Sequence, residues 1–192
     1  MNYLAHLLLS GNNEKILFGN FIADWVKGNK YLQYPIEIKR GILMHRQIDS
    51  FTDHHRLHKH SRTYFAPSYG HFSGIVVDVV FDHFLSVHWN EFHKGNRIEF
   101  IKKAYISIER YRWFLPPRPK RLLPSMVHHD WIGSYASIYG LNKVLERMSQ
   151  RTALPAFSKD AITILRDNYE AIESDFMAFF PELYSYISER EF

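Results

Sequence analysis

Polar residues recur in pairs, four positions apart, within the apolar segments of this chain. The four pairs lie in the first 82 residues and are Asn2 and His6, Asn20 and Asp24, His45 and Asp49, and Asp78 and Asp82. On an α-helix, residues four apart lie on the same face, one turn above the other. Because large apolar side chains surround each pair, the pattern predicts helices that carry polar groups on faces that will be buried.

Hydrophobic periodicity also predicts an all-α fold. Alternation of β-branched residues is almost absent, and no Asn-Gly or Asp-Gly hairpin signal occurs. Helical segments are expected over residues 2–10, 14–28, 36–51, 72–92, 97–114, 138–151 and 158–178. A break is expected around Pro67, Ser68 and Gly70, a rigid loop or the neck of a flexible flap at 116–119, and a short C-terminal piece from Pro181. We therefore expect one all-α domain over residues 1–192, with about seven or eight helices around one core.

The absence of cysteine limits the chemistry that the chain can carry. It excludes a disulfide framework, a thiolate nucleophile and any zinc site with cysteine ligands, so a metal would need His and carboxylate ligands. Two aspartates on one inward face, as at Asp78 and Asp82, would repel each other and would be costly to bury unpaired. A cation would relieve both problems, and this donor set suits Mn, Mg, Fe or Zn better than copper.

The alternative to a metal site is that each pair has an ordinary structural role. A histidine on an apolar helix is often a hydrogen-bonded core residue, and an aspartate pair is often exposed. The coincidence of four similar pairs favours the metal site. Two other groups are set aside: His54, His55, His58 and His60 lie among cationic neighbours and suggest a solvated surface, and the His128-His129-Asp130 run lacks a helical partner.

The net charge of +4 is unevenly distributed along the chain. Residues 1–96 carry 10 Lys/Arg against 8 Asp/Glu, residues 97–155 carry 11 against 4, and residues 156–192 carry 3 against 8. The basic middle third predicts contact with an acidic partner, and duplex nucleic acid is disfavoured because such proteins are usually more basic. No membrane span or secretory signal is recognisable, so a cytoplasmic protein is expected.

Four ordered motifs give the chain a specific resemblance. They are MNYLAHL at 1–7, GNFIAD at 19–24, HRQID at 45–49 with Thr52-Asp53 after it, and DVVFDHFL at 78–85 with His88-Trp89 after it. Their order and spacing resemble those of the bacterial acyl carrier protein phosphodiesterases, and the resemblance continues more weakly toward the C-terminus. That family is similar to the HD superfamily of metal-dependent phosphohydrolases, which are all-helical. The usual HD dipeptide is here reversed, as Asp82-His83, or split, as His45 and Asp49.

The resemblance implies an activity, a metal and a set of site residues. The activity is hydrolysis of the phosphodiester that joins 4′-phosphopantetheine to a serine of holo acyl carrier protein, and the expected metal is Mn²⁺. The motif positions expected to bind metal are His6, Asp24, His45, Asp49, Asp78 and Asp82.

Further residues are expected to act on the substrate. His83, and after it His88, are expected to protonate the leaving serine oxygen, while Arg46 and Lys27 are expected to hold phosphate oxygens. The acidic carrier protein is expected to dock on the basic surface, defined by Arg110, Arg112, Arg118, Lys120 and Arg121.

Two other functions remain open on sequence alone. An HD-type phosphohydrolase would keep the metal but act on nucleotides or another small phosphodiester. A non-catalytic module would use its basic third to bind an acidic protein or RNA, although no RRM or KH motif is present.

Overall fold

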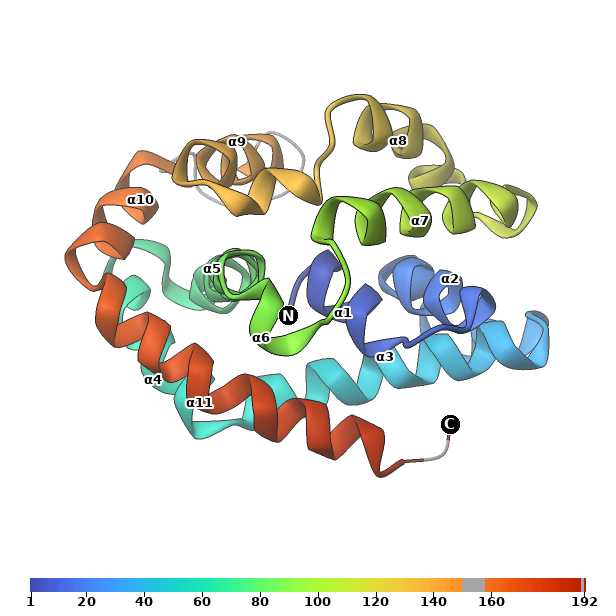
Figure 1. Ribbon diagram of the computed structural model, residues 1–192, viewed down its shortest axis with the longest axis horizontal. Helices are drawn as coiled ribbons and strands as arrows, with labels where there is room; N and C mark the ends of the chain where they lie inside the picture. The colour runs from blue at the N-terminus through green and yellow to red at the C-terminus, as the bar shows by residue number, and fades with distance from the viewer. Residues whose placement is uncertain (150–157, 191) are drawn as a thin grey trace.

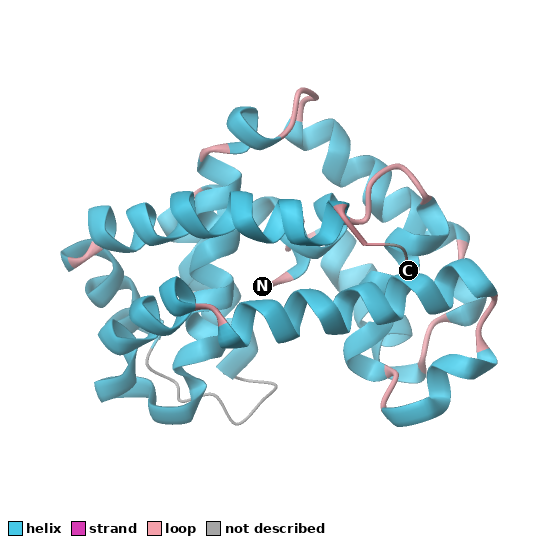
Figure 2. Ribbon diagram, turned by 90° about the horizontal axis from the view of Figure 1, so that it is seen from below, coloured by secondary structure: helices cyan, strands magenta, loops and turns pink. Residues whose placement is uncertain are grey.

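The computed structural model describes residues 1–149, 158–190 and 192, and every regular element within these ranges is a helix (Figure 1, Figure 2). The α-helices are α1 (Tyr3–Leu9), α2 (Glu14–Ile22), α3 (Ile36–His54), α4 (Arg56–Tyr69), α5 (Ser73–Val87), α6 (Trp89–Phe92), α7 (Arg97–Arg110), α8 (Pro117–His128), α9 (Ile138–Ser149), α10 (Ser158–Asp167) and α11 (Tyr169–Ser188). Short 3₁₀ helices are η1 (Ala23–Trp25), η2 (Gly28–Gln33), η3 (Gly70–Phe72), η4 (Arg112–Phe114) and η5 (Gly133–Ala136). The all-α prediction is confirmed.

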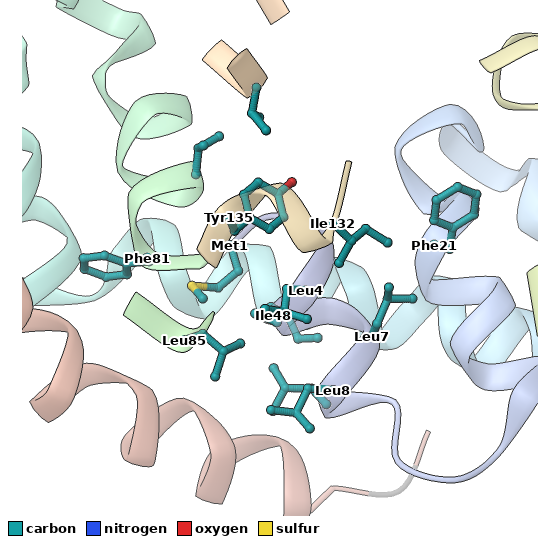
Figure 3. Close-up of a cluster of buried hydrophobic side chains, with 14 of the residues drawn as sticks. Met1, Leu4, Leu7, Leu8, Phe21, Ile48, Phe81, Leu85, Ile132 and Tyr135 are labelled. Atoms are coloured by element: carbon teal, nitrogen blue, oxygen red, sulfur yellow. The ribbon is translucent and has the colours of Figure 1, made fainter. Parts of the chain in front are cut away.

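Helix α1 lies at the centre of the fold, where the longer helices surround it (Figure 1). All of its residues from Leu4 to Leu9 are buried. Figure 3 shows Leu4, Leu7 and Leu8 among side chains of the neighbouring elements, including Leu85 of α5. A helix of seven residues is unstable by itself in water, so its stability here comes from this packing and from its caps.

Helices α2 and α3 approach each other very closely because each has a glycine at the contact. A Cβ at Gly19 would overlap the main-chain oxygen of Ile38, and a Cβ at Gly41 would overlap that of Ile16. No side chain larger than hydrogen fits at either position without separating the helices. The contact brings Asn20, which follows Gly19, against the face of α3 that carries His45.

Two differences between the predicted and observed helix boundaries lie at prolines. The loop predicted at 116–119 is wrong: α8 begins at Pro117, where a first-turn proline loses no helical hydrogen bond. The break predicted around Pro67, Ser68 and Gly70 occurs at the last of these residues: α4 ends at Tyr69 and is followed by Gly70, which has a φ of 51°, while Pro67 itself lies inside the helix. Pro181 lies inside α11, and does not begin a separate piece.

Residues 56–87 have the length and composition of a membrane span but are folded as part of the core. The segment comprises α4, η3 and α5, and 61% of its most apolar window is buried inside the protein. The core helix of a compact protein meets the same criteria, so this segment is weak evidence for a membrane span.

Candidate metal centre

Three of the predicted pairs contribute a side chain to one cluster. His45 Nε2 lies 3.0 Å from Asp49 Oδ2 and 3.5 Å from Asp24 Oδ1, while His6 Nε2 lies 3.2 Å from Asp49 Oδ1. The two imidazole rings are stacked, with centroids 4.0 Å apart. We call these four residues the His–Asp group. Its histidines are buried, whereas its two carboxylates are partly exposed, so the group faces solvent on its acidic side.

Asn20 lies behind the two imidazoles and fixes their orientation. Its Oδ1 accepts hydrogen bonds from Nδ1 of His6, at 2.9 Å, and from Nδ1 of His45, at 3.1 Å. Its Nδ2 donates to the main-chain oxygen of His6 and to Ser10 Oγ. Because a main-chain carbonyl can only accept, the amide has one possible orientation. Both histidines therefore carry a proton on Nδ1 and direct Nε2 toward the carboxylates.

This arrangement fits a bound cation. With Nδ1 protonated, a neutral His6 presents the lone pair of Nε2 to Asp49 Oδ1 and to the main-chain oxygen of Met1, which is 3.2 Å away. Three acceptors then face one another, which is unfavourable unless a positive charge lies between them. Histidine ligands with the second ring nitrogen bonded to an amide or carbonyl oxygen are typical of protein metal sites. His6, His45 and Asp49 each offer a ligand atom, and these atoms lie within 4.8 Å of one another.

The charges of the His–Asp group are strongly coupled. Burial disfavours protonation of His45, but hydrogen bonds to Asp24 and Asp49 outweigh burial and raise the pKa of His45 to about 9. Burial and the neighbouring His45 lower the pKa of His6. Burial opposes ionisation of Asp49, yet hydrogen bonds from the two imidazoles hold its pKa below the usual range. The group thus has the negative charge and the shared proton that a divalent cation would replace.

The His–Asp group opens into a cavity of about 710 Å³, which we call the first cavity. Arg62 of α4 and the imidazoles of His54 and His71 also line it. Asp53 and Asp78 complete its acidic lining. The first cavity therefore combines a cluster of carboxylates with one guanidinium and two additional imidazoles, which is a suitable setting for a charged ligand.

Asp78 lines the first cavity but has other partners. Its Oδ1 lies 2.9 Å from the α-amino group of Met1 and 3.0 Å from His58 Nε2. Burial opposes ionisation of Asp78, but the positive charge of the Met1 amino group and the bond from His58 lower its pKa.

Asp82 lies outside the His–Asp group. It is fully buried, and its two oxygens accept from the main-chain N–H groups of Leu4, at 2.7 Å, and Ala5, at 3.2 Å. It therefore caps the N-terminus of α1 from a different helix. Burial raises the pKa of Asp82 to about 7, although the two N–H donors act in the opposite direction.

The two histidines predicted to be general acids are held in other contacts. Buried His83 donates Nδ1–H to the main-chain oxygen of Tyr135, at 2.7 Å, and its Nε2 lies 3.0 Å from the Tyr169 hydroxyl. His88 bridges Glu91 and Glu173, at 2.7 Å each. Neither lines the first cavity.

Arg46 and Lys27 also lie outside the first cavity. Arg46 Nη2 donates to the main-chain oxygens of Val26, at 3.0 Å, and Gly28, at 2.8 Å, and its guanidinium lies over the Tyr31 ring. It therefore fixes the segment that follows Asp24. Lys27 borders a second cavity of about 410 Å³, which meets the first at Asp24.

Comparisons with known proteins decide the family. A family model described as "Acyl carrier protein phosphodiesterase" matches residues 1–183. A protein of Yersinia pestis with that name is 34% identical over 184 residues, which is 95% of each chain. A protein of Serratia proteamaculans with the same name is 31% identical over 192 residues, and this alignment covers 100% of both chains. The chain belongs to the acyl carrier protein phosphodiesterase family. No solved structure matches it, so the similarity to the HD superfamily stays a prediction.

In this member of the acyl carrier protein phosphodiesterase family, several residues at or beside the first cavity escape the sequence analysis, among them Asn20, His54, His58, Arg62 and His71. Asn20 was noticed only as the partner of Asp24 in a polar pair, although its position in a buried segment with two histidines nearby is a signal for a positioning amide. His54 and His58 belong to the histidine-rich stretch that the sequence predicts to be a solvated surface, and Arg62 is one of the cationic neighbours of that stretch. His58 is in fact fully buried beside Asp78, and Arg62 lines the first cavity.

Proposed function

We propose that this protein is an acyl carrier protein phosphodiesterase, which hydrolyses the bond between 4′-phosphopantetheine and a serine of holo acyl carrier protein. Water would add to phosphorus, the bond from phosphorus to the serine oxygen would break, and that oxygen would take up a proton. The observation that carries the proposal is the His–Asp group at an open cavity, together with membership of the family over nearly the whole chain.

The metal in this proposal is a divalent cation, with Mn²⁺ as the expected ion. His6, His45 and Asp49 would hold it, with Asp24 beside them, and Asp82 would support the site indirectly by capping α1. When bound, such a cation lowers the pKa of water and offsets negative charge on phosphoryl oxygens. Asp78 would contribute negative charge to the same cavity from its place beside Met1.

Residues of the first cavity would orient the phosphodiester. Arg62 is the guanidinium that lines it, and a guanidinium binds two phosphate oxygens at once. The partly exposed Asp24 carboxylate can orient water by accepting a hydrogen bond from it. His54 and His71 are the two imidazoles outside the His–Asp group that line the cavity, and one of them would give the proton to the leaving serine oxygen.

Acyl carrier protein would dock on the basic surface, which spans the end of α7, η4 and the first turns of α8. Its cations are not equally available, because Arg110 pairs with Glu14 and Arg112 with Glu109. Lys120 lies over the ring of Trp113, whose side chain is 88% exposed. An exposed tryptophan bordered by cations suits an acidic, partly apolar helix. Such a substrate would place the enzyme in the cytoplasm.

The test is mass spectrometry of holo acyl carrier protein incubated with the protein and Mn²⁺. The expected result is that the carrier protein loses the mass of 4′-phosphopantetheine. With the Asp49→Ala variant of the enzyme, the mass of the carrier protein should stay unchanged. A parallel panel of nucleotides should remain intact. Hydrolysis of nucleotides with an unchanged carrier protein would reject the proposal in favour of a nucleotide phosphohydrolase, and no hydrolysis of either would favour a binding module.

A further inference from the structure

The second cavity, of about 410 Å³, lies directly beside the first. The two share Asn2, Tyr3, Asp24 and Met148 in their linings. Its volume is within the range of small-molecule sites and is too small to admit a folded protein segment. A ligand whose phosphate lies in the first cavity can therefore extend a thin substituent into the second.

The walls of the second cavity are mainly apolar and come from distant parts of the chain. Trp25 belongs to η1 and Leu122 to α8, Trp131 lies just before η5 and Tyr135 within it, and Val144 belongs to α9. Aromatic and aliphatic walls of this kind bind alkyl groups and the faces of amides. They offer little to a strongly charged ligand or to water.

Three cations border this apolar space, and one of them has unused hydrogen-bonding capacity. They are Lys27, Arg118 and Arg147. Within the ranges that the structure describes, Nη1 of Arg147 is buried and has no hydrogen-bond acceptor, and the guanidinium lies 5.6 Å from the centre of the Trp131 ring. A buried donor without an acceptor is costly, so a ligand carbonyl at this point would be favoured.

We infer that the second cavity binds the pantetheine chain of the substrate; this inference rests on the proposed function. The phosphodiester has two substituents, and the serine side is attached to a folded protein that must stay outside. The other is a flexible chain with a dimethyl-substituted carbon, two amides and a terminal thiol. Its alkyl groups match the apolar walls, and its amide oxygens match the unused donor of Arg147. Arg118 belongs both to this cavity and to the basic surface, so the chain would enter next to the docked carrier protein.

Two variants test the inference in complementary ways. Leu122→Trp narrows the cavity, and Arg147→Met removes the donor while keeping a long apolar side chain. Each should raise KM for holo acyl carrier protein by roughly tenfold or more, with kcat within about threefold, because one contact in a small-molecule pocket has effects of this size. Hydrolysis of methyl p-nitrophenyl phosphate, whose methyl group is too short to reach the second cavity, should be unchanged. Tyr139→Ala, on the exposed face of α9, is the matched control and should alter neither reaction.

A binding measurement separates this inference from the proposed function. Pantetheine should bind to the protein in EDTA, as measured by calorimetry, and both cavity variants should weaken that binding by roughly tenfold. If wild-type protein hydrolyses holo acyl carrier protein but the two variants leave KM and pantetheine binding unaltered, the inference fails and the function stands. If no hydrolysis occurs yet pantetheine binding depends on Leu122 and Arg147, the proposed function fails and the cavity assignment stands.

Discussion

Asn20 is the residue that gives the two histidines of the His–Asp group the correct tautomer. One amide oxygen holds both Nδ1 protons, and the Gly19–Gly41 contact keeps that amide in place. Without it, each imidazole could rotate or move its proton to Nε2, where the proton would compete with a metal. The role of Asn20 is therefore to hold the two imidazoles in place from behind.

We predict that Asn20→Ala weakens Mn²⁺ binding by roughly 10- to 100-fold, because partners of metal-bound histidines have effects of this size. Calorimetric titration of folded protein with MnCl₂ measures the change. Ser10→Ala is the control, since it removes a buried hydrogen bond to Asn20 Nδ2 but leaves the amide oxygen and both imidazoles untouched. Equal losses of Mn²⁺ affinity in the two variants would contradict a specific role for Asn20.

Asp82 provides a second prediction at this scale, because a cap and a metal ligand respond differently to removal. Asp82→Ala leaves the buried N–H groups of Leu4 and Ala5 without acceptors, which should lower the free energy of unfolding by about 1–3 kcal/mol. Mn²⁺ affinity of the folded variant should change little. Asp49→Ala, by contrast, should strongly weaken Mn²⁺ binding and should change the free energy of unfolding little. The measurements are urea unfolding and Mn²⁺ titration, and loss of Mn²⁺ binding from folded Asp82→Ala would make Asp82 a ligand after all.

At the scale of helices, the contact between α2 and α3 positions the His–Asp group, because Asn20 of α2 meets His45 of α3 across it. We predict that Gly41→Ala lowers the free energy of unfolding by about 1–3 kcal/mol, because its Cβ would overlap the main-chain oxygen of Ile16 and force the helices apart. It should also weaken Mn²⁺ binding, since Asn20 and His45 lie on opposite sides of this contact. Gly74→Ala in α5 is the control, because the atoms nearest to its Cβ belong to the Arg62 side chain, at 3.5 Å. A Gly41→Ala protein as stable as wild type would contradict the packing argument.

His88 joins the end of α5 to α11 through a hydrogen bond to Glu173. This contact makes the stability of the fold depend on pH. Burial opposes protonation of His88, but the carboxylates of Glu173 and Glu91 outweigh it and raise its pKa above 6.5. A raised pKa in the folded state means that the protonated imidazole stabilises the fold below pH 6.5 and that this stabilisation is lost as the pH rises through the raised value.

The expected result is that His88→Gln costs more stability at about pH 5.5 than at about pH 9, because only the imidazolium attracts both carboxylates. Urea unfolding of wild type and variant at the two pH values measures the difference. Glu173→Gln, which removes one of the carboxylates, should show the same trend. If the difference in free energy of unfolding between wild type and His88→Gln widened as the pH rose, the role assigned to His88 would be refuted.

The positions of helices and of polar pairs could be predicted from the sequence more reliably than which pairs lie close together in space. Periodicity located most helices, and the pairs containing His6, Asp24, His45 and Asp49 do converge. Asp82 followed the same spacing rule, yet its partners are the main-chain N–H groups of α1. Spacing places two residues on one face but does not say which helix covers that face. The prolines show a similar limit, because a proline in the sequence does not reveal whether packing will keep the surrounding segment helical. Pro117, Pro124 and Pro181 all lie within helices that pack against neighbouring elements.

At the scale of the whole molecule, the charge distribution follows the arrangement of the two cavities. Asp24, Asp49, Asp53 and Asp78 line the first cavity, the second cavity adjoins the first, and Arg118 of the basic surface lines the second. A carrier protein docked on α8 would therefore have its prosthetic group next to the place where it is cleaved. Long-range attraction between the acidic carrier protein and this surface would mainly accelerate association.

We predict that the double variant Lys120→Glu/Arg121→Glu lowers kcat/KM for holo acyl carrier protein by about tenfold at low ionic strength, and that the deficit shrinks as salt is added, because steering by exposed charges is screened. Arg118 is left intact because it borders the second cavity. Arg56→Glu/Lys59→Glu on α4 makes the same change in net charge at an exposed site far from α8 (Figure 1) and should have little effect. Steady-state kinetics on holo acyl carrier protein and on bis(p-nitrophenyl) phosphate separate docking from chemistry. Equal losses on both substrates, or equal losses in the two double variants, would show that the basic surface is not where the carrier protein binds.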